Sequence, residues 1–379
     1  MTNSPYRIID TPSKLETFAA EIAGSKTISV DMEADSMHHF KERVCLIQMA
    51  ANGKKALIDA IALSDMSPVK PLFSDPDIEK IFHGADYDIR SLHRYFQIEV
   101  SHLFDTQVAA MWAGDRETGL EAALRTRVGV SITKKYQKKD WSMRPLPPEM
   151  LDYAISDVGH LVDLSQSLKR DLRRMGRLEW VLEECEAVSR VRRSEKEPGP
   201  LFAGVKGAGR LKPRSLAALE SLLKFRKSAA KKKDRPLFKI ISDRRLLEIA
   251  RAMPGDMKRL KALNALSPRQ TAMHGKEILR RLERVRKADP SDYPAPAKRK
   301  PRRRRSRRAA SRMEALKAWR DRKAGELALP QGLVCGKKIM AAVAEADPSG
   351  PGDLEKIPGM RPWRRREFGP EILSALEKV

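Results

Sequence analysis

Apolar and polar positions follow two different periods along this chain of 379 residues. In the front part, strand-like runs such as TISVDME (27–33), RVCLIQMA (43–50) and KALIDA (55–60) stand beside a helical segment, SKLETFAAEIA (13–23). Strand-like runs separated by very short gaps predict antiparallel hairpins, whereas the later alternation of strand and helix predicts parallel crossovers. We therefore expect an α/β domain with a mixed sheet.

From residue 147 onward the apolar spacing is that of helices. The segment 147–176 begins with two prolines, which suit the first turn of a helix, and it ends in basic residues and Gly176. Between these ends, apolar residues recur at intervals of three and four, as on one face of a helix. This pattern predicts that the α/β domain closes with helices.

The back half contains an internal repeat at a constant offset of 94 residues. Pro236 corresponds to Pro330, and the segment HGKEILRRLERV (274–285) corresponds to FGPEILSALEKV (368–379). A match of helices, prolines and endings without a gap predicts a duplicated small helical domain.

Two segments of different composition separate these parts. The segment around GPLFAGVKGAGR is rich in Gly and Pro, and KADPSDYPAPAKRKPRRRRSRRAA is rich in Pro and Arg with no apolar period, so both are predicted linkers. The expected order is the α/β domain (1–195), a linker (196–212), the first helical domain (213–287), a basic linker (288–310) and the second helical domain (311–379).

The net charge of +25 is distributed unevenly. Residues 1–200 carry 28 basic and 31 acidic side chains, and residues 201–379 carry 47 and 19, so the two net charges are −3 and +28. This contrast predicts chemistry in the front half and binding of a polyanion by the back half. Nucleic acid is favoured over an anionic membrane, because the sequence has no amphipathic membrane helix and no lipidation motif.

The three cysteines, Cys45, Cys185 and Cys335, lie far apart and form no CxxC pair, which excludes a disulfide framework and a cysteine-based zinc site. The N-terminus lacks the layout of a signal peptide, and no apolar run reaches 18 residues. We expect a soluble, cytoplasmic protein with no membrane partner, and the sequence leaves its oligomeric state open.

Acidic side chains stand where several predicted elements begin or end. Asp31 and Glu33 close the first strand-like run and lie on one face of it, because side chains alternate along a strand. Asp88 lies just inside a helix that follows a buried strand. Tyr153 and Asp157 project from one helix face, one turn apart.

Four converging carboxylates without basic partners would raise one another's pKa values, unless divalent cations neutralise them. Oxygen ligands suit Mg²⁺ or Mn²⁺, which keep coordination positions open for phosphate oxygens and water. The residues taken alone also permit a second interpretation, in which each acid is a strand cap or a solvated helix residue.

The order of these residues resembles a known superfamily. D-x-E after a strand, then H-G-A-x-x-D, then Y-x-x-x-D on a helix resembles the DEDD 3′→5′ exonucleases in their tyrosine-containing branch. The neighbouring segments RVCLIQMA, LFDTQVAA, GLEAALRTRVGV and KKDWSMRPLP resemble ribonuclease D, and each copy of the repeat resembles the HRDC domain that this family shares with RecQ-type helicases. The resemblance covers nearly the whole chain. It implies a ribonuclease H-like α/β exonuclease domain followed by two small all-α HRDC-type domains.

The resemblance also implies roles for the five motif residues. Asp31, Glu33 and Asp157 would hold one of two divalent ions, Asp31 would also touch the second, and Asp88 would help through water. Tyr153 would orient the attacking water and help to deprotonate it. This assignment fits two-metal hydrolysis of a phosphodiester, in which one ion lowers the pKa of the water and the other stabilises the leaving 3′-oxygen.

Five further residues are candidates for binding the substrate. Phe40 is a candidate for the apolar side chain against the terminal base. Lys138, Lys139 and Arg144 are candidates for phosphate contacts, and Trp141 either lines the substrate groove or anchors a loop to the core.

The predicted function is that of a metal-dependent 3′→5′ exoribonuclease that releases 5′-monophosphates from RNA 3′ ends. The resemblance implies maturation of tRNA precursors, or of other structured stable RNA. Two alternatives stay open, namely an exonuclease directed at DNA and a nucleic-acid-binding protein with an inactive site. A helicase accessory is disfavoured, because no G-x-x-x-x-G-K-[ST] phosphate loop occurs.

Overall fold

The computed structural model of the protein describes residues 6–193, 199–294 and 306–377. Within these ranges the chain forms two compact units. The first unit holds residues 6–34, 44–193 and 306–377, and the second unit holds residues 35–43 and 199–294. The α/β domain and the second helical domain therefore belong to one unit, and the first helical domain belongs to the other.

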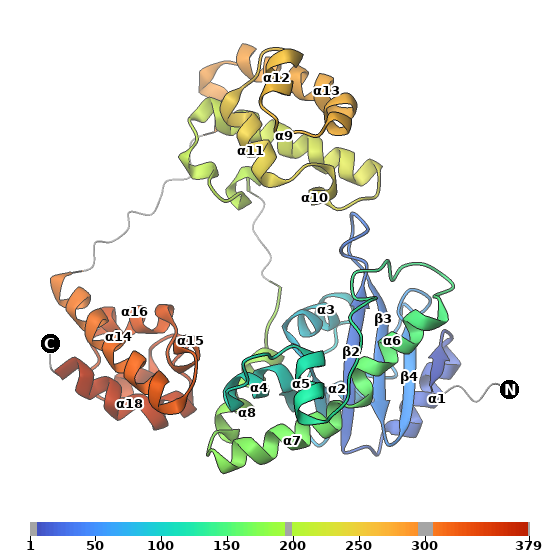
Figure 1. Ribbon diagram of the computed structural model, residues 1–379, viewed down its shortest axis with the longest axis vertical. Helices are drawn as coiled ribbons and strands as arrows, with labels where there is room; N and C mark the ends of the chain where they lie inside the picture. The colour runs from blue at the N-terminus through green and yellow to red at the C-terminus, as the bar shows by residue number, and fades with distance from the viewer. Residues whose placement is uncertain (1–5, 194–198, 295–305, 378–379) are drawn as a thin grey trace. The chain divides into compact units, whose positions relative to one another are not determined.

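The first unit is built on a mixed sheet (Figure 1). Its strands are β1 (Arg7–Ile9), β2 (Thr27–Ala34), β3 (Val44–Ala51), β4 (Lys54–Asp59), β5 (Glu79–Phe82) and β6 (Leu103–Asp105), in the spatial order β1-β4-β3-β2-β5-β6. Strands β2, β3 and β4 pair antiparallel, whereas β1 with β4, β2 with β5 and β5 with β6 pair parallel. The mixed sheet expected from the strand spacing is confirmed, and β2 lies in its interior.

Helices pack on this sheet. They are α1 (Pro12–Ile22), α2 (Lys70–Ser74), α3 (Asp86–Phe96), α4 (Thr106–Ala113), α5 (Leu120–Arg127), α6 (Pro148–Gly159), α7 (Leu161–Arg174) and α8 (Leu178–Ser189). The segment 147–176 forms two helices, α6 and α7, which meet at His160, where the backbone leaves the helical region (φ −124°, ψ 10°). Gly159 precedes this break and is a poor helix former.

The duplicated helical domain has the same helices in the same order in both copies. The first copy contains α9 (Pro213–Lys232), α10 (Leu237–Ile240), α11 (Asp243–Ala252), α12 (Met257–Ala262) and α13 (Pro268–Lys287). The second contains α14 (Arg307–Leu327), α15 (Gln331–Val334), α16 (Lys337–Ala346), α17 (Pro351–Glu355) and α18 (Pro362–Glu377). Helices α11 and α16 are offset by 94 residues at both ends, as the repeat in the sequence requires.

The predicted first linker is partly a structured segment. Phe202, Val205, Ala208 and Leu211 are buried in the core of the first copy, and short 3-10 turns at Leu201–Gly204 and Ala208–Arg210 present them. The segment was predicted to be a linker because of its Gly- and Pro-rich composition, although its apolar residues recur every three positions. Positions 196–198 of the first linker, and positions 295–305 of the second with the arginine tract 302–305, lie outside the described residues.

The second copy shares one continuous hydrophobic core with the α/β domain, whereas the first copy has a core of its own. The ring of Trp363 on α18 stacks on that of Trp180 on α8, with centroids 4.9 Å apart and planes at 18°, and it meets Trp112 of α4 edge-on. Carboxylates of α8 surround this contact, because Glu183 accepts the backbone N–H of Trp363 and Glu184 accepts its indole N–H. The second copy is thus docked on the α/β domain.

None of the described helices is both long enough and apolar enough to cross a membrane.

Candidate active site

The first two acids lie on the central strand. Asp31 and Glu33 of β2 pair with Gln48 and Leu46 of β3, and they share one face of the sheet because they are two residues apart. The register shifts directly after Glu33, so the regular ladder ends where the second carboxylate stands. β2 therefore presents both acids at its C-terminal end.

Asp88 is positioned by the turn between β5 and α3. The turn requires Gly84, whose φ of +78° lies in the left-handed region that favours glycine. The side chain of Asp105 holds the turn in place, since it accepts the backbone N–H of Gly84 at 2.9 Å and that of Ala85 at 2.8 Å. Asp88 is buried in the first turn of the helix that starts there.

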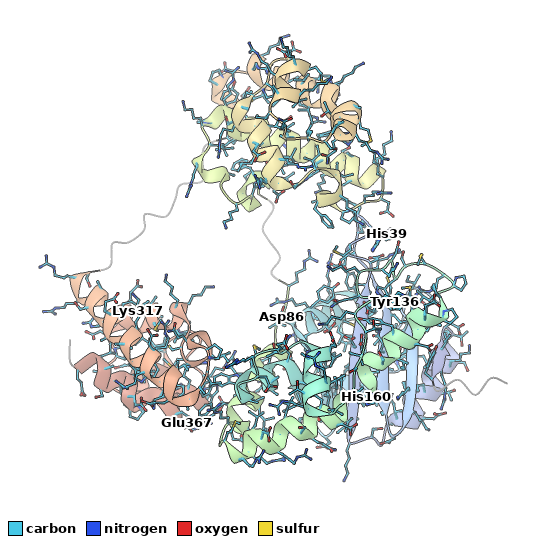
Figure 2. The ribbon with its side chains drawn as sticks, in the orientation of Figure 1. His39, Asp86, Tyr136, His160, Lys317 and Glu367 are labelled. Atoms are coloured by element: carbon cyan, nitrogen blue, oxygen red, sulfur yellow. The ribbon has the colours of Figure 1, made fainter. Side chains whose placement is uncertain are left out.

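Tyr153 and Asp157 lie one turn apart on α6, and both are buried. The ring of Tyr153 packs against two other rings, with centroids 6.0 Å from that of Trp141 and 5.9 Å from that of Tyr136. Tyr136 is labelled in Figure 2. Its hydroxyl interacts with the carboxyl group of Asp157 and tends to lower the pKa of that group. The two aromatic neighbours therefore fix the direction in which the Tyr153 hydroxyl points.

Four of the five motif residues line one cavity of about 490 Å³, namely Asp31, Glu33, Tyr153 and Asp157. The remaining lining comes from β2, the β5–α3 turn, the start of α4, the start of α5, the segment 132–137 and the start of α7. It consists of Met32, His83, Gly84, Gln107, Gly119, Leu120, Glu121, Ile132, Thr133, Lys134, Gln137 and Leu161. Asp88 does not belong to this lining, but its charge interacts with that of Asp31. The three sequence motifs therefore meet at one place.

The electrostatics of the acids show the same convergence. Burial raises the pKa of Glu33 to about 10, and the charges of Asp31, Asp157 and Asp88 add to the rise. Burial, with the charge of Asp31, raises the pKa of Asp157 to about 8, although the hydrogen bond from Tyr153 opposes it. Burial also raises the pKa of Asp31 to about 6 and that of Asp88 well above its usual range. The described surroundings of the cluster therefore disfavour the ionised forms of these acids and offer them no compensating positive charge.

This donor set fits divalent cations. Carboxylate oxygens are the ligands that Mg²⁺ and Mn²⁺ prefer, and a cation would offset the repulsion that raises these pKa values. As the side chains stand, no three acidic, histidine or cysteine groups within the described ranges form a closed cation site. Binding of an ion would therefore require the carboxylate oxygens to move toward it.

The candidate substrate residues lie in different environments. Phe40 is not part of the cavity lining and belongs to the second unit, where its backbone N–H donates to Asp234 at 3.1 Å and its ring packs against the core of the first copy. Lys138 and Lys139 are exposed beside the cavity-lining segment 132–137. Trp141 is fully buried, and of its two interpretations the structure supports the loop anchor.

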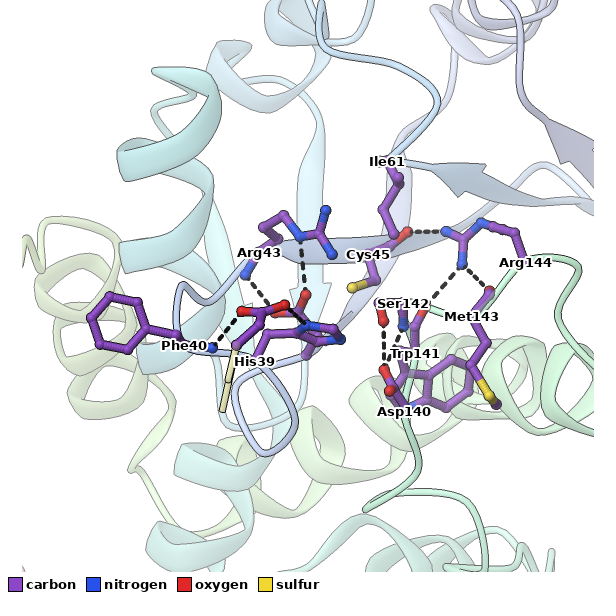
Figure 3. A network of polar contacts seen from close by, with 12 residues as sticks. His39, Phe40, Arg43, Cys45, Ile61, Asp140, Trp141, Ser142, Met143 and Arg144 are labelled. Atoms are coloured by element: carbon purple, nitrogen blue, oxygen red, sulfur yellow. Dashed lines mark hydrogen bonds and ion pairs between the residues drawn. The ribbon is translucent and has the colours of Figure 1, made fainter. Parts of the chain in front are cut away.

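Arg144 is held in a network of internal bonds (Figure 3). Its guanidinium donates to both carboxylate oxygens of Asp59, at 2.6 and 2.7 Å, and to the backbone carbonyls of Trp141, Met143 and Cys45. These bonds use all five N–H donors of an arginine. In this arrangement Arg144 has no donor left for a phosphate, and it holds the loop that carries Trp141.

Sequence reasoning missed several residues of the site. Gln107, Lys134 and Gln137 line the cavity, and Asp105 holds the turn before Asp88. The signal for Asp105 was its position at the end of a short buried strand, where a carboxylate can cap the next helix, and it does cap α4. Gln107 and Gln137 carry no such signal, because uncharged polar side chains are common in exposed segments.

Comparisons with known proteins agree with this geometry. A family model described as a 3′–5′ exonuclease matches residues 6–173, and an HRDC-domain model matches twice, at 215–282 and 309–376. Ribonuclease D of Shewanella sp. (strain ANA-3) is 30% identical over 290 residues, which are 76% of this chain and 75% of the relative. Ribonuclease D of Escherichia coli (strain K12) is 27% identical over 292 residues, which are 77% and 78% of the two chains.

Two solved structures share the fold. That of Escherichia coli RNase D aligns with a TM-score of 0.70 at 23% identity and covers 99% of each chain. The catalytic core of RRP6 from Trypanosoma brucei aligns with a TM-score of 0.63 at 25% identity, and covers 76% of this chain and 82% of that one. The expected fold class, an exonuclease domain with a mixed sheet followed by HRDC domains, is confirmed.

Fold and site together define a 3′→5′ exonuclease that carries a C-terminal pair of nucleic-acid-binding HRDC domains. Exonuclease domains of this class generally depend on divalent metal ions. The chain belongs to the ribonuclease D family, and it is an exoribonuclease, a hydrolase of phosphodiester bonds.

Proposed function

We propose that this exoribonuclease removes nucleotides as 5′-monophosphates from the 3′ ends of structured RNA, with Asp31, Glu33, Asp88 and Asp157 holding two divalent ions, Mg²⁺ or Mn²⁺. One observation carries the proposal. Carboxyl groups from a strand (half-buried) and two helices (buried) interact with one another, and three of them line one cavity. Each has a pKa raised by burial, with the charge of a neighbouring acid adding to the rise for three of them.

Each protein group has a stated task in this proposal. The four acids would hold the ions, which when bound would supply an activated water and stabilise the leaving 3′-oxygen. Tyr153 orients that water, because the tyrosine hydroxyl can both donate and accept a hydrogen bond. The rings of Trp141 and Tyr136 hold the ring of Tyr153 in place. Lys134 at the cavity wall is suited to a substrate phosphate.

Precursors of tRNA are the proposed substrates within the class of structured RNA. The Escherichia coli relative is described as an exoribonuclease involved in structured RNA processing. The net charge of +28 on residues 201–379 supports binding of such an RNA through its phosphates, with an affinity that falls steeply as salt increases.

The test uses the full chain and a tRNA with a 3′ extension. We expect release of 5′-monophosphates in Mg²⁺ or Mn²⁺, no release in the presence of a chelator, and loss of turnover in Asp31→Asn and Asp157→Asn with RNA affinity changed by only a few fold. The matched control is Asp152→Asn, since Asp152 lies exposed on the same helix and accepts a hydrogen bond from Tyr6. Wild-type rates in either site variant would refute the metal assignment.

A second arm addresses the nucleic acid. Matched 3′-tailed RNA and DNA are degraded side by side, and we expect faster release from RNA, because discrimination at the 3′ end acts through contacts with the 2′-hydroxyl. Equal or faster degradation of the DNA would contradict the proposed substrate class.

A further inference from the structure

The two copies of the helical domain use one face in different ways. In the second copy this face docks on the α/β domain. Trp363 stacks on Trp180, Phe368 meets Trp180 edge-on with centroids 5.6 Å apart, and the backbone carbonyl of Leu327 accepts a hydrogen bond from Arg177 at 2.7 Å. The face is therefore formed by the end of α14, the segment after it and the first half of α18.

The corresponding face of the first copy is a basic pocket of about 580 Å³. It is formed by the end of α9, the segment around α10, the start of α11 and the first half of α13. Five cationic side chains line it, namely Lys233, Arg235, Lys239, Arg245 and Arg269, and all five are exposed. The rest of the described lining is Ile240, Ser267, Gln270, Met273 and His274, so no carboxylate is among the described lining residues.

The offset of 94 residues relates the two faces position by position. Each of the five cations is replaced by an apolar residue in the second copy, in the order Leu327, Leu329, Leu333, Ile339 and Trp363, and His274 is replaced by Phe368. The framework beneath the face is retained. Gln270 donates to the carbonyl of Ile240, and Arg364, its counterpart, donates to the carbonyl of Val334.

The cations of the first copy and their apolar counterparts in the second copy also differ in burial. Leu329, Trp363 and Phe368 belong to the core that the second copy shares with the α/β domain. The cations of the first copy point into an open pocket, whose inner wall is His274, packed edge-on against Phe225 with centroids 5.5 Å apart. A buried floor with exposed cations around it suits an anionic ligand, because close like charges repel until an anion neutralises them.

We propose that this basic face of the first copy binds phosphates of the RNA substrate, while the equivalent face of the second copy is reserved for docking on the α/β domain. The inference rests on the proposed function for the identity of the ligand. Five exposed cations line one pocket with no carboxylate among its described lining residues, and three of them are arginines, whose planar group matches a phosphate with two parallel hydrogen bonds. An acidic protein surface is the other ligand with this chemistry, and the test separates the two.

The test compares two charge-neutralising pairs in the full chain. R235Q/R269Q removes two cations from the pocket, and K258Q/K261Q removes two exposed cations from α12, which does not contribute to the lining. We expect R235Q/R269Q to weaken binding of a 3′-tailed hairpin RNA roughly tenfold at fixed salt and to reduce the slope of log K against log salt by about one to two. The control pair should change both quantities much less.

The outcomes separate this inference from the proposed function. The rate on a trinucleotide, too short to require the pocket, should be unchanged in R235Q/R269Q and should report on the active site alone. Equal weakening by both pairs, or unchanged RNA binding by R235Q/R269Q, would overturn the inference even if the wild type degrades RNA. A wild type that binds RNA through this face and releases no nucleotide would refute the proposed function and leave the inference standing. Unchanged RNA binding by R235Q/R269Q, together with weakened binding of an acidic protein, would assign the face to a protein partner instead.

Discussion

The carboxylate of Asp105 accepts a hydrogen bond from the backbone N–H of Ala85 at 2.8 Å, across 20 residues of sequence. With the bond to Gly84, this links the end of β6 to the turn that starts α3. Asp105 thereby sets the position of Asp88 without lining the cavity itself.

We predict that Asp105→Ala weakens both the fold and the chemistry. The variant removes the acceptor of four backbone N–H groups, those of Gly84, Ala85, Gln107 and Val108, and frees the turn before Asp88. The cost is about 1–3 kcal/mol for each of these groups that stays buried and unsatisfied. Thermal unfolding and the rate of nucleotide release are the measurements. Asp65→Ala is the control, since Asp65 also accepts from a turn N–H, that of Ser67, but is exposed. Full activity with an unchanged melting temperature would argue against this role.

Trp141 supports the ring of Tyr153 from within the core, and its indole N–H is buried with no hydrogen-bond partner. Trp141→Ala should cost about 3–5 kcal/mol of stability through the cavity that it creates. Trp141→Phe should cost much less, because it keeps an aromatic ring and removes the unsatisfied donor. Urea unfolding of the two variants checks this order, and equal losses would contradict it.

Tyr153→Phe tests the hydroxyl apart from the ring. The ring contacts with Trp141 and Tyr136 remain, so we expect a wild-type melting temperature and wild-type RNA affinity. The turnover rate should fall by roughly 10²-fold, in the range that a positioned proton-transfer group contributes. Tyr136→Phe, which also removes one phenolic hydroxyl, is the control. A rate loss of the same size in both variants would contradict the proposed role of the Tyr153 hydroxyl.

Asp157→Asn should stabilise the metal-free protein while it abolishes turnover. Burial raises the pKa of Asp157 to about 8 from an ordinary value of 3.8. The native carboxyl therefore holds its proton more tightly than the unfolded one, so ionisation destabilises the fold increasingly between these two values. Melting curves in chelator should show a larger gain for the variant at pH 8 than at pH 5. A gain that shrinks with rising pH would contradict the direction of the shift.

The contact of the second copy with α8 has a consequence for truncation. On sequence alone, the front half should work without the basic half. In the structure, removing the second copy would uncover Trp112 and Trp180. Trp363→Ala should already lower the stability of the first unit by about 3–5 kcal/mol, measured by tryptophan fluorescence during unfolding. Phe238→Ala, an exposed site in the first copy, is the control and should be almost neutral.

Local patterns were enough for several conclusions. The hairpins of β2, β3 and β4 follow from short gaps between strand-like runs, and the repeat follows from a constant offset. The motif acids stand near the ends of predicted strands and helices. The two-residue repeat of a strand and the 3.6-residue repeat of a helix then show which acids share a face. The convergence of Asp31, Glu33 and Asp157 on one cavity then depends on the order of the strands.

Other residues could not be assigned in this way. Arg144 looked like a phosphate ligand because it follows two lysines in a basic segment, but its donors are used by Asp59 and by carbonyls up to 99 residues away. The Gly-rich segment 199–212 looked like a linker, but four of its apolar residues belong to the core of the first copy. Distant partners decide both cases.

The amino-acid order was sufficient to specify the carboxylate chemistry, the mixed sheet and the duplication, because these depend on residue type and on periods within a few turns of chain. Which helical copy docks on the catalytic domain, and which keeps its basic face open, required the folded molecule. Aligned sequences show leucines and a tryptophan in place of cations, but only packing of Trp363 on Trp180 shows what those apolar residues are buried against. Packing between segments about 180 residues apart depends on the whole fold, so it produces no periodic pattern in the local sequence.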